Sequence, residues 1–366
     1  MRAISLVQTF AAVAALALAP AASAATDGYR ISGPAVHENL AIYFVHGQGA
    51  SGPVPLALQE ALSQSLVRVH ETGQVSELAI ENLGDQEVFV QSGDIVKGGQ
   101  QDRVLTVSLI IPPRSGRVPI ASYCVEQGRW TARGKEDVKT FASSTAAVPS
   151  REAKLAMKEV APAQAQSAAT SLAAVPEHPV HRESARRTQR AEARPVDAQG
   201  RIWSSVADMQ KKLAGTLSSP VAAAASPSSL QLALENDKLK QAVAAHVAAL
   251  NGAGERGDDV LGYVLAINGK LSSAEIYPSN GLFRKMWAKQ LEAAATEAIA
   301  EKKSAAEELP STDAVLAFLD ASREAAPREK PLAAALRMQV REAPKAVFSE
   351  TLRADGRFVH KSYVAK

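Results

Sequence analysis

The stretch from Val88 to Trp130 constrains the fold more than any other part of the chain. It holds the densest strand pattern, several turn-forming glycines and prolines, and the single cysteine. Within it, RVLTVSLII (103–111) sends successive side chains to opposite faces, which predicts a half-buried antiparallel strand. Short strands spaced about 8 to 12 residues apart and separated by glycine and proline turns favour a β-sandwich or a barrel-like sheet.

Composition limits the classes of partner. Hydrophobic residues make up 46 % of the chain and aromatic residues only 5 %, and alanine is abundant, which predicts alanine-rich helices beside a smaller packed core. The 41 basic and 38 acidic residues are well mixed and give a formal charge of +3. This balance indicates neither a nucleic acid nor an anionic membrane as partner.

The first 24 residues have the pattern of a signal peptide. Arg2 is followed by the apolar run TFAAVAALALA and by the small residues Ala22-Ser23-Ala24. Such a pattern predicts cleavage after Ala24 and a mature start at Ala25. No later stretch approaches the roughly 18 apolar residues of a membrane span, so we expect a soluble periplasmic or secreted protein.

The remaining chain is predicted to comprise a β-rich part and a helical part. A strand at 40–47, a helix at 53–70 and strands at 75–83, 87–93 and 118–126 predict a β-rich domain over 25–142. Residues 143–229 are rich in alanine, serine and proline, with amphipathic helices at 150–161 and 200–215 between linkers. A stronger helix follows at 229–250 and ends at Asn251-Gly252.

Strand character returns near the C-terminus. Residues 259–277 predict a hairpin that turns at Asn268-Gly269, and a helix over 281–303 follows with Ser279 or Asn280 as its cap. The part 230–303 therefore reads as helix, hairpin and helix, and it is open whether it packs on the first sheet. The charged tail 304–366 contains one more possible hairpin, turning at Asp355-Gly356.

Four spaced blocks carry a resemblance to a known family. They are LQEALSQSLVRVHETGQVSELAIENL, GDIVKGGQQDRVL, SYCVEQGRW and GYVLAINGKLSSAEIYPSNGLFRKMWAKQL. In these blocks, over roughly Gly28 to Glu301 with the low-complexity tract between, the chain resembles the ARG and rhodanese-phosphatase-associated protein domain, a functionally uncharacterised bacterial family. The resemblance implies a neighbourhood of ADP-ribose and phosphate chemistry and supplies no catalytic residues.

The first candidate site is the glycine-rich turn at 93–103. Gly93 and Gly98-Gly99 flank Lys97, and Gln101 and Arg103 follow. Exposed backbone N–H groups beside two cations can bind phosphate or carboxylate. The sequence lacks the patterns GxxxxGK[ST] and GxGxxG. A structural turn with a salt-bridged arginine is the alternative.

The second candidate cluster is Cys124, Glu126, Arg129 and Trp130. On a strand, Cys124 and Glu126 point to one face about 7 Å apart. A nearby carboxylate raises a thiol pKa and so disfavours a nucleophilic role. We therefore interpret Cys124 as a small buried residue and Trp130 as a lid on the core. Glu126 is expected to pair with a cation or to border a cleft.

Other catalytic patterns are weak. His37, His46, His70 and Glu71 lack the spacing of a zinc motif, and no GxSxG pattern is present. His46 and His70 are the histidines that a reactive Cys124 would need, but no pattern links them to it. No metal or cofactor is predicted.

Together these features predict an α+β protein whose N-terminal part resembles an antiparallel β-sandwich. The leading function is an exported binding or scaffold-like protein, with no nucleic-acid partner and with a small molecule or a protein as ligand. Its predicted anion-accepting cleft is lined by Lys97, Gln101, Arg103, Cys124, Arg129 and Trp130. The alternative is a hydrolase of an ADP-ribose-like or other phosphorylated small molecule, with Glu126 as general base.

Overall fold

A computed structural model describes residues 28–129, 131, 133–134, 136–158, 198–303 and 307–366. The predicted signal peptide and most of the predicted linker lie outside these residues. The described chain is α+β with almost entirely antiparallel sheets, which confirms the predicted fold class.

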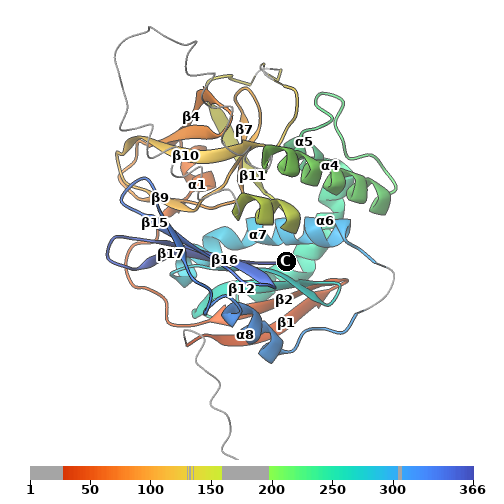
Figure 1. The fold of residues 1–366 in the computed structure, drawn as a ribbon. Helices are drawn as coiled ribbons and strands as arrows, with labels where there is room; N and C mark the ends of the chain where they lie inside the picture. Colours follow the sequence, from red (N-terminus) through yellow and green to blue (C-terminus); the bar gives the residue numbers. More distant parts are fainter. Residues whose placement is uncertain (1–27, 130, 132, 135, 159–197, 304–306) are drawn as a thin grey trace, which may run out of the picture.

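The larger sheet joins the two ends of the chain (Figure 1). Its eight strands, in spatial order, are β1 (Arg30–His37), β2 (Leu40–His46), β12 (Val260–Ile267), β13 (Lys270–Ile276), β17 (Phe358–Ala365), β16 (Ala346–Leu352), β15 (Arg337–Glu342) and β14 (Arg328–Pro331). Strand β2 pairs with β12, so the N-terminal strands belong to the same sheet as the predicted C-terminal hairpins.

Two smaller sheets hold the stretch that dominates the sequence. The six-stranded sheet has the order β11 (Phe141–Ala147), β7 (Asp94–Gly98), β8 (Arg103–Leu105), β10 (Gly116–Cys124), β5 (Glu77–Asn82) and β4 (Val67–Gln74), and the three-stranded sheet has the order β3 (Leu56–Ala57), β6 (Val88–Val90) and β9 (Leu109–Ile111). The N–H of Glu71 on β4 donates to the carbonyl of Lys139, just before β11, at 2.9 Å. The two edge strands of the six-stranded sheet therefore nearly meet, and the sheet curls toward a barrel.

Helices cover both faces of the larger sheet. The described helices are α1 (Leu58–Ser63), one at 151–158, α4 (Ala198–Thr216), α5 (Leu230–Leu234), α6 (Asp237–Gly254), α7 (Asn280–Ala300) and α8 (Thr312–Asp320). Along β12, Tyr263 and Leu265 belong to the core cluster that includes α7, whereas Val264 and Ala266 belong to the cluster that includes α8. Because side chains alternate along a strand, β12 is buried on both faces.

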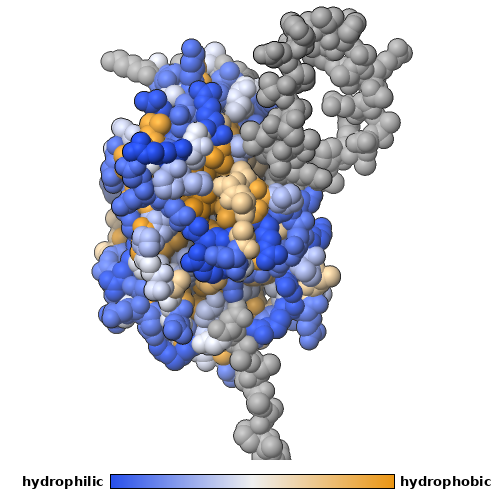
Figure 2. All heavy atoms as spheres, turned by 90° about the vertical axis from the view of Figure 1, so that its left-hand side faces the viewer, coloured by the Kyte–Doolittle hydropathy of each residue, from blue (hydrophilic) through white to orange (hydrophobic). Residues whose placement is uncertain are grey.

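Helix α7 connects the sheets into one core. Its residues Phe283 and Trp287 belong to the same hydrophobic cluster as Leu78 and Ile80 of the six-stranded sheet. A contiguous cluster of this kind is the mark of a shared core. Figure 1 shows α7 between the larger sheet below and the smaller sheets above. Figure 2 shows apolar side chains gathered near the middle of one face, with hydrophilic side chains around them.

Several predicted turns and caps are confirmed. The β12–β13 hairpin turns at Asn268 and Gly269, which both have positive φ as a type I′ turn requires. Ser279 caps α7, because its side chain accepts the N–H of Leu282. Strands β16 and β17 form the predicted last hairpin.

The predicted strand at 103–111 is two strands, β8 and β9, in different sheets. The whole stretch is buried, not half-buried, because the larger sheet and the two smaller ones enclose it. The chain therefore changes sheets at Thr106 to Ser108, where polar side chains interrupt the apolar run.

Two predicted helices are wrong in extent. The helix at 53–70 is only α1, because Ser65 adopts a φ of 57° and β4 begins at Val67. The helix at 229–250 is α5 and α6, because Asn236 lies between them in extended conformation. Its side chain accepts the N–H groups of Lys238 and Leu239 and thereby starts α6.

Within the described part of the chain, every helix is too short or too polar to cross a membrane.

We predict that Gly262→Ala lowers the free energy of unfolding by about 1–3 kcal/mol. An added Cβ would lie 2.2 Å from the carbonyl oxygen of Glu275 and 2.9 Å from Cα of Ile276, on backbone that cannot move without breaking the β12–β13 pairing. The measurement is the urea midpoint of each variant.

The matched control is Gly252→Ala in α6, where no atom lies within 4 Å of the added Cβ. Alanine there is expected to stabilise the helix by about 0.5–1 kcal/mol. Equal stabilities of the two variants would contradict the tight pairing of β12 with β13.

Candidate functional site

A cavity of about 880 Å³ lies between strand β11 and helices α5, α6 and α7. Pockets of several hundred cubic ångströms hold small-molecule ligands. About half of the residues that line it are apolar, among them Ala142, Ala146, Leu234, Val243, Val247 and Ala293. The space stays open because many of these side chains are alanine, too short to reach across it. We refer to this cavity as the cleft.

Helix α6 contributes one continuous face to the cleft. Its lining residues are Lys240, Val243, Ala244, Val247 and Ala248. The spacing is that of one face of an α-helix. Sequence reasoning identified the helix and not this face as a site, although the spacing was visible in the sequence.

One end of the cleft carries a linked set of polar side chains. Lys97 Nζ lies 2.6 Å from Oε1 of Glu235 on the chain just after α5, and Gln231 Nε2 donates to the same oxygen at 2.9 Å. Ser144 Oγ on β11 donates to Gln231 Oε1 at 2.6 Å. Burial raises the pKa of Glu235, but the hydrogen bonds from Lys97 and Gln231 and the charge of Lys240 outweigh it and lower the pKa overall.

A buried ion network lies next to this end of the cleft. Arg133 makes two hydrogen bonds to Asp102, at 2.8 and 3.0 Å, and Arg129 Nε donates to Glu126 Oε2 at 2.8 Å. Both carboxylates are fully buried. Asp102 also accepts the Ser229 hydroxyl at 2.9 Å, which links β8 to the start of α5. The network fixes the position of α5 against the six-stranded sheet.

The surroundings of Glu126 argue against the predicted role of general base. Its Oε2 accepts the N–H of Asp102 at 3.1 Å as well as Arg129, and its Oε1 lies 3.4 Å from Arg133. A base needs a lone pair that can reach the substrate proton. Two arginines and full burial close this carboxylate to a substrate, so its evident role is structural.

Arg103 is also enclosed. Its side chain is fully buried, and Nη1 donates to the carbonyl of Val75 at 2.7 Å and to Sγ of Cys124 at 2.8 Å. Nη2 lies 3.3 Å from both carboxylate oxygens of Glu71. The arginine therefore ties β8 to β4 and β10 and presents no donor to the cleft.

The structure separates the residues that the sequence placed together. Lys97 lines the cleft, whereas Gln101 is buried away from it and Arg129 belongs to the ion network. Trp130 lies outside the described residues. Glu235, Lys240 and Glu292 were missed, because they are far from Lys97 in the sequence and line the same cleft only through the packing of α5, α6 and α7.

The histidines that a reactive Cys124 would need are engaged elsewhere. His46 is on the larger sheet, where its Nε2 lies 2.6 Å from Ser32 Oγ and its Nδ1 lies 2.9 Å from Asp259 Oδ1. His70 pairs with Glu81 at 2.9 Å. Within the described residues, no group of three or more His, Cys, Asp or Glu side chains is arranged to hold a metal ion.

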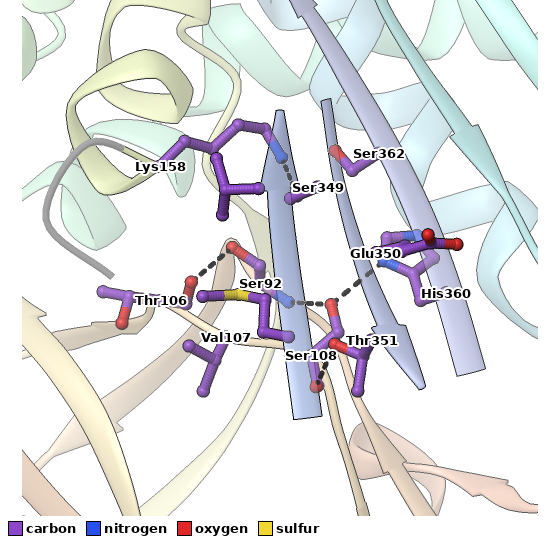
Figure 3. A pocket seen from close by; sticks show the side chains of 12 residues that line it. Ser92, Thr106, Val107, Ser108, Lys158, Ser349, Glu350, Thr351, His360 and Ser362 are labelled. Carbon is purple, nitrogen blue, oxygen red and sulfur yellow. Dashed lines mark hydrogen bonds between the residues drawn. The ribbon is translucent and has the colours of Figure 1, made fainter. Parts of the chain in front are cut away.

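A second, small polar cavity joins the two halves of the molecule (Figure 3). Ser108 Oγ accepts the N–H of Ser92 at 3.0 Å and lies 3.0 Å from Nδ1 of His360. The other ring nitrogen, Nε2, lies 3.1 Å from Oε2 of buried Glu275 without good hydrogen-bond alignment. The cavity measures about 20 Å³, the size of one water molecule, and we interpret it as a structural junction.

Lys158 closes this small cavity from the helix at 151–158. Its Nζ donates to Ser349 Oγ on β16 at 2.7 Å, as Figure 3 shows. Burial lowers the pKa of Lys158 to about 8. The charge of Glu275 raises this pKa in part, and the charge of Lys154 lowers it further.

A comparison with protein-family models matched residues 28–364, nearly the whole chain, to the family described as ARG and Rhodanese-Phosphatase-superfamily-associated Protein domain. No curated protein and no solved structure matched the chain. The match confirms the resemblance seen in the four sequence blocks. It extends beyond them through β14 to β17.

We predict that Cys124 does not react with iodoacetamide in the folded protein at pH 8. Burial raises the pKa of its thiol to about 11, although the charge of Arg103 lowers it in part, so the reactive thiolate is scarce as well as inaccessible. Mass spectrometry would measure alkylation before and after addition of urea. Rapid alkylation of the folded protein would contradict the burial of this strand.

We predict that Lys158→Met is more stable than the wild-type protein at pH 7 and that this difference narrows between about pH 8 and 10.5. Between the lowered pKa of the folded state and the ordinary value of 10.5, the unfolded chain binds more protons. Wild-type stability therefore rises with pH across this window, relative to a side chain that does not titrate. Urea midpoints at pH 7, 9 and 10.5 measure the difference, and a constant difference would contradict the burial of the ammonium group.

Proposed function

Because this chain belongs to the ARG and rhodanese-phosphatase-superfamily-associated protein domain family, whose name records an association and no reaction, we propose its function from the cleft. We propose that the protein is an exported small-molecule-binding protein and that its ligand occupies the cleft between β11 and helices α5, α6 and α7.

The observation that carries this proposal is the cleft itself. It combines about 880 Å³ of volume, apolar wall segments on β11 and α6, and polar groups at defined positions. Binding sites for small molecules share this combination, in which the apolar wall supplies affinity and the polar groups fix orientation. The ion network beside the cleft favours a rigid wall, and rigid sites lose little entropy on binding.

Lys97 supports the anion-accepting part of the proposal. It lies on the wall with Lys240 nearby, and Glu235 is the one carboxylate that pairs with it among the residues that the structure describes. A ligand carboxylate or phosphate placed between the two lysines would gain charge-assisted hydrogen bonds.

Binding is a better proposal than hydrolysis. The predicted base, Glu126, is buried between two arginines outside the cleft. No described residue of the cleft wall is a histidine or a cysteine, the usual general base and the most reactive nucleophile.

Export is part of the proposal and rests on the sequence of residues 1–24. A periplasmic or secreted location suits a binding protein with one cysteine, because the thiol of Cys124 is buried on strand β10 and protected from oxidation.

We predict that Ala244→Trp abolishes ligand binding in the cleft while the protein remains folded. The indole would occupy cavity space without displacing core atoms, because Ala244 faces the cleft and is exposed. The measurement is a thermal-shift screen against nucleotides, ADP-ribose, sugar phosphates and amphipathic acids and amines. A compound at about 100 times its dissociation constant adds roughly 2.7 kcal/mol to stability.

The matched control is Ala249→Trp, an exposed position of α6 that does not line the cleft. It should retain every shift that the wild-type protein shows. Compounds that shift the melting temperature of Ala244→Trp as much as that of the wild-type protein bind elsewhere and would contradict the proposed site. The absence of a shift with every compound would favour a scaffold role with a protein partner.

A further inference from the structure

The cleft has two chemically different ends, set by the antiparallel packing of α6 and α7. Asn251 near the end of α6 accepts the indole N–H of Trp287 in the first half of α7 at 2.9 Å. Leu239 at the start of α6 lies in the same apolar cluster as Ile299 near the end of α7. Residues that follow Trp287 along α7 therefore lie beside progressively earlier residues of α6.

The first end is cationic. Lys97 and Lys240 both lie there, and both act on Glu235, the first by an ion pair at 2.6 Å and the second by its charge. The amide of Gln231 takes part of the hydrogen-bonding capacity of Glu235. Glu136, also on the wall, pairs with Arg133 at 3.0 Å. Lys240 is left with an uncompensated charge among these groups.

The second end carries a carboxylate without a cation. Glu292 lines the cleft from α7, and no described residue pairs with or donates to its side chain. It is open to the solvent of the cavity, yet burial by the surrounding protein raises its pKa. From the Asn251–Trp287 contact, a rise of 1.5 Å per residue places Glu292 about 10 Å along the helix axes from Lys240.

Between the two ends the wall is mainly apolar, and the two hydroxyls that line it, those of Ser144 and Thr296, already donate to Gln231 and to the carbonyl of Glu292. Val243, Ala244 and Val247 fill the α6 side, and Ala142 and Ala146 fill the β11 side. A ligand that spans the cleft must therefore present an apolar middle, because a polar group there would lose its water without finding a partner.

We propose that the cleft selects an elongated ligand with an anionic group at one end, an apolar middle and an ammonium or similar donor at the other. The anion lies between Lys97 and Lys240, and the cation pairs with Glu292. This inference rests on the proposed binding function and adds the class of ligand.

The experiment compares four probes of equal chain length: 8-aminooctanoate, octanoate, octylamine and octanol. Isothermal titration calorimetry or NMR titration gives the dissociation constant of each. Since a partly exposed ion pair contributes up to about 1 kcal/mol, each charged end is expected to tighten binding about two- to fivefold over octanol. 8-Aminooctanoate should bind most tightly.

Two variants test which end of the cleft binds the carboxylate of the probe and which end binds its ammonium group. Glu292→Gln should remove the advantage of 8-aminooctanoate over octanoate and leave octanoate unchanged. Lys240→Gln should remove the advantage of 8-aminooctanoate over octylamine and leave octylamine unchanged. Glu255→Gln, at the C-cap of α6 and beyond the cleft, is the control and should change neither comparison.

The outcomes separate this inference from the function on which it rests. If the probes bind, compete with one another and are blocked by Ala244→Trp, but show no preference among end groups, the cleft binds ligands and the proposed ligand class is wrong. If either variant shifts all four dissociation constants equally, the charged side chains act on the shape of the cleft and not on the ligand ends, which also overturns the inference. If no probe binds, both the function and the inference fail for this chemistry.

Discussion

The ion pair between Lys289 and Asp94 is the interaction on which the arrangement of the two halves depends. Lys289 lies in the middle of α7, Asp94 begins β7, and both side chains are almost completely buried. Asp94 also accepts the N–H of Gln91 at 2.9 Å, and the amide oxygen of Gln91 accepts the hydroxyl of Tyr277 at 2.9 Å. Removing one partner of such a pair leaves a buried charge, which costs far more than the pair contributes. The pair therefore specifies where α7 lies against the six-stranded sheet.

The cleft follows from that position. Helix α7 packs on the larger sheet through Phe283 and Trp287 and is held to β7 by Lys289, so its alanine-rich second half stands beside β11 without filling the space. Helix α6 closes the other side. The ion network of Asp102, Glu126, Arg129 and Arg133 fixes α5 at the same edge. Buried ion pairs thus fix the positions of α7 and α5. Many of the side chains that face the cleft between them are small and apolar.

Local signals predicted local structure well. The dipeptide Asn268-Gly269 specified a hairpin turn, and Ser279 specified the start of α7, because each depends on residues a few positions away. The division of 103–111 between two sheets was not predictable from alternation, because all of its side chains are buried from both sides. An alternating pattern of apolar and polar residues indicates a strand with one buried face, and it does not reveal a strand that is buried on both faces.

Prediction of the candidate site from the sequence is limited in a similar way, because residues that meet at the site are far apart in the chain. Lys97 was predicted as a ligand-binding residue of a glycine-rich turn. It lies on β7 and lines the cleft, and its partner Glu235 is 138 positions away in the sequence. Arg103 was predicted to bind an anion, because a cation beside glycines can do so, and Glu126 was predicted as a general base in the alternative function. Their burial depends on contacts with Glu71, Arg129 and Arg133, and pattern alone does not show which charges are internal.

The central claim is that ligands occupy the cleft, and its wall offers a direct reporter. The alanines that line it are Ala142, Ala146, Ala147, Ala244, Ala248 and Ala293. A methyl NMR spectrum of the protein labelled at alanine, recorded during titration with 8-aminooctanoate, measures where the probe lies. We predict chemical-shift changes at these methyl groups and none at Ala249 or at Ala333 to Ala335. Shifts concentrated at the second set, or no shifts at all with saturating probe, would contradict the account.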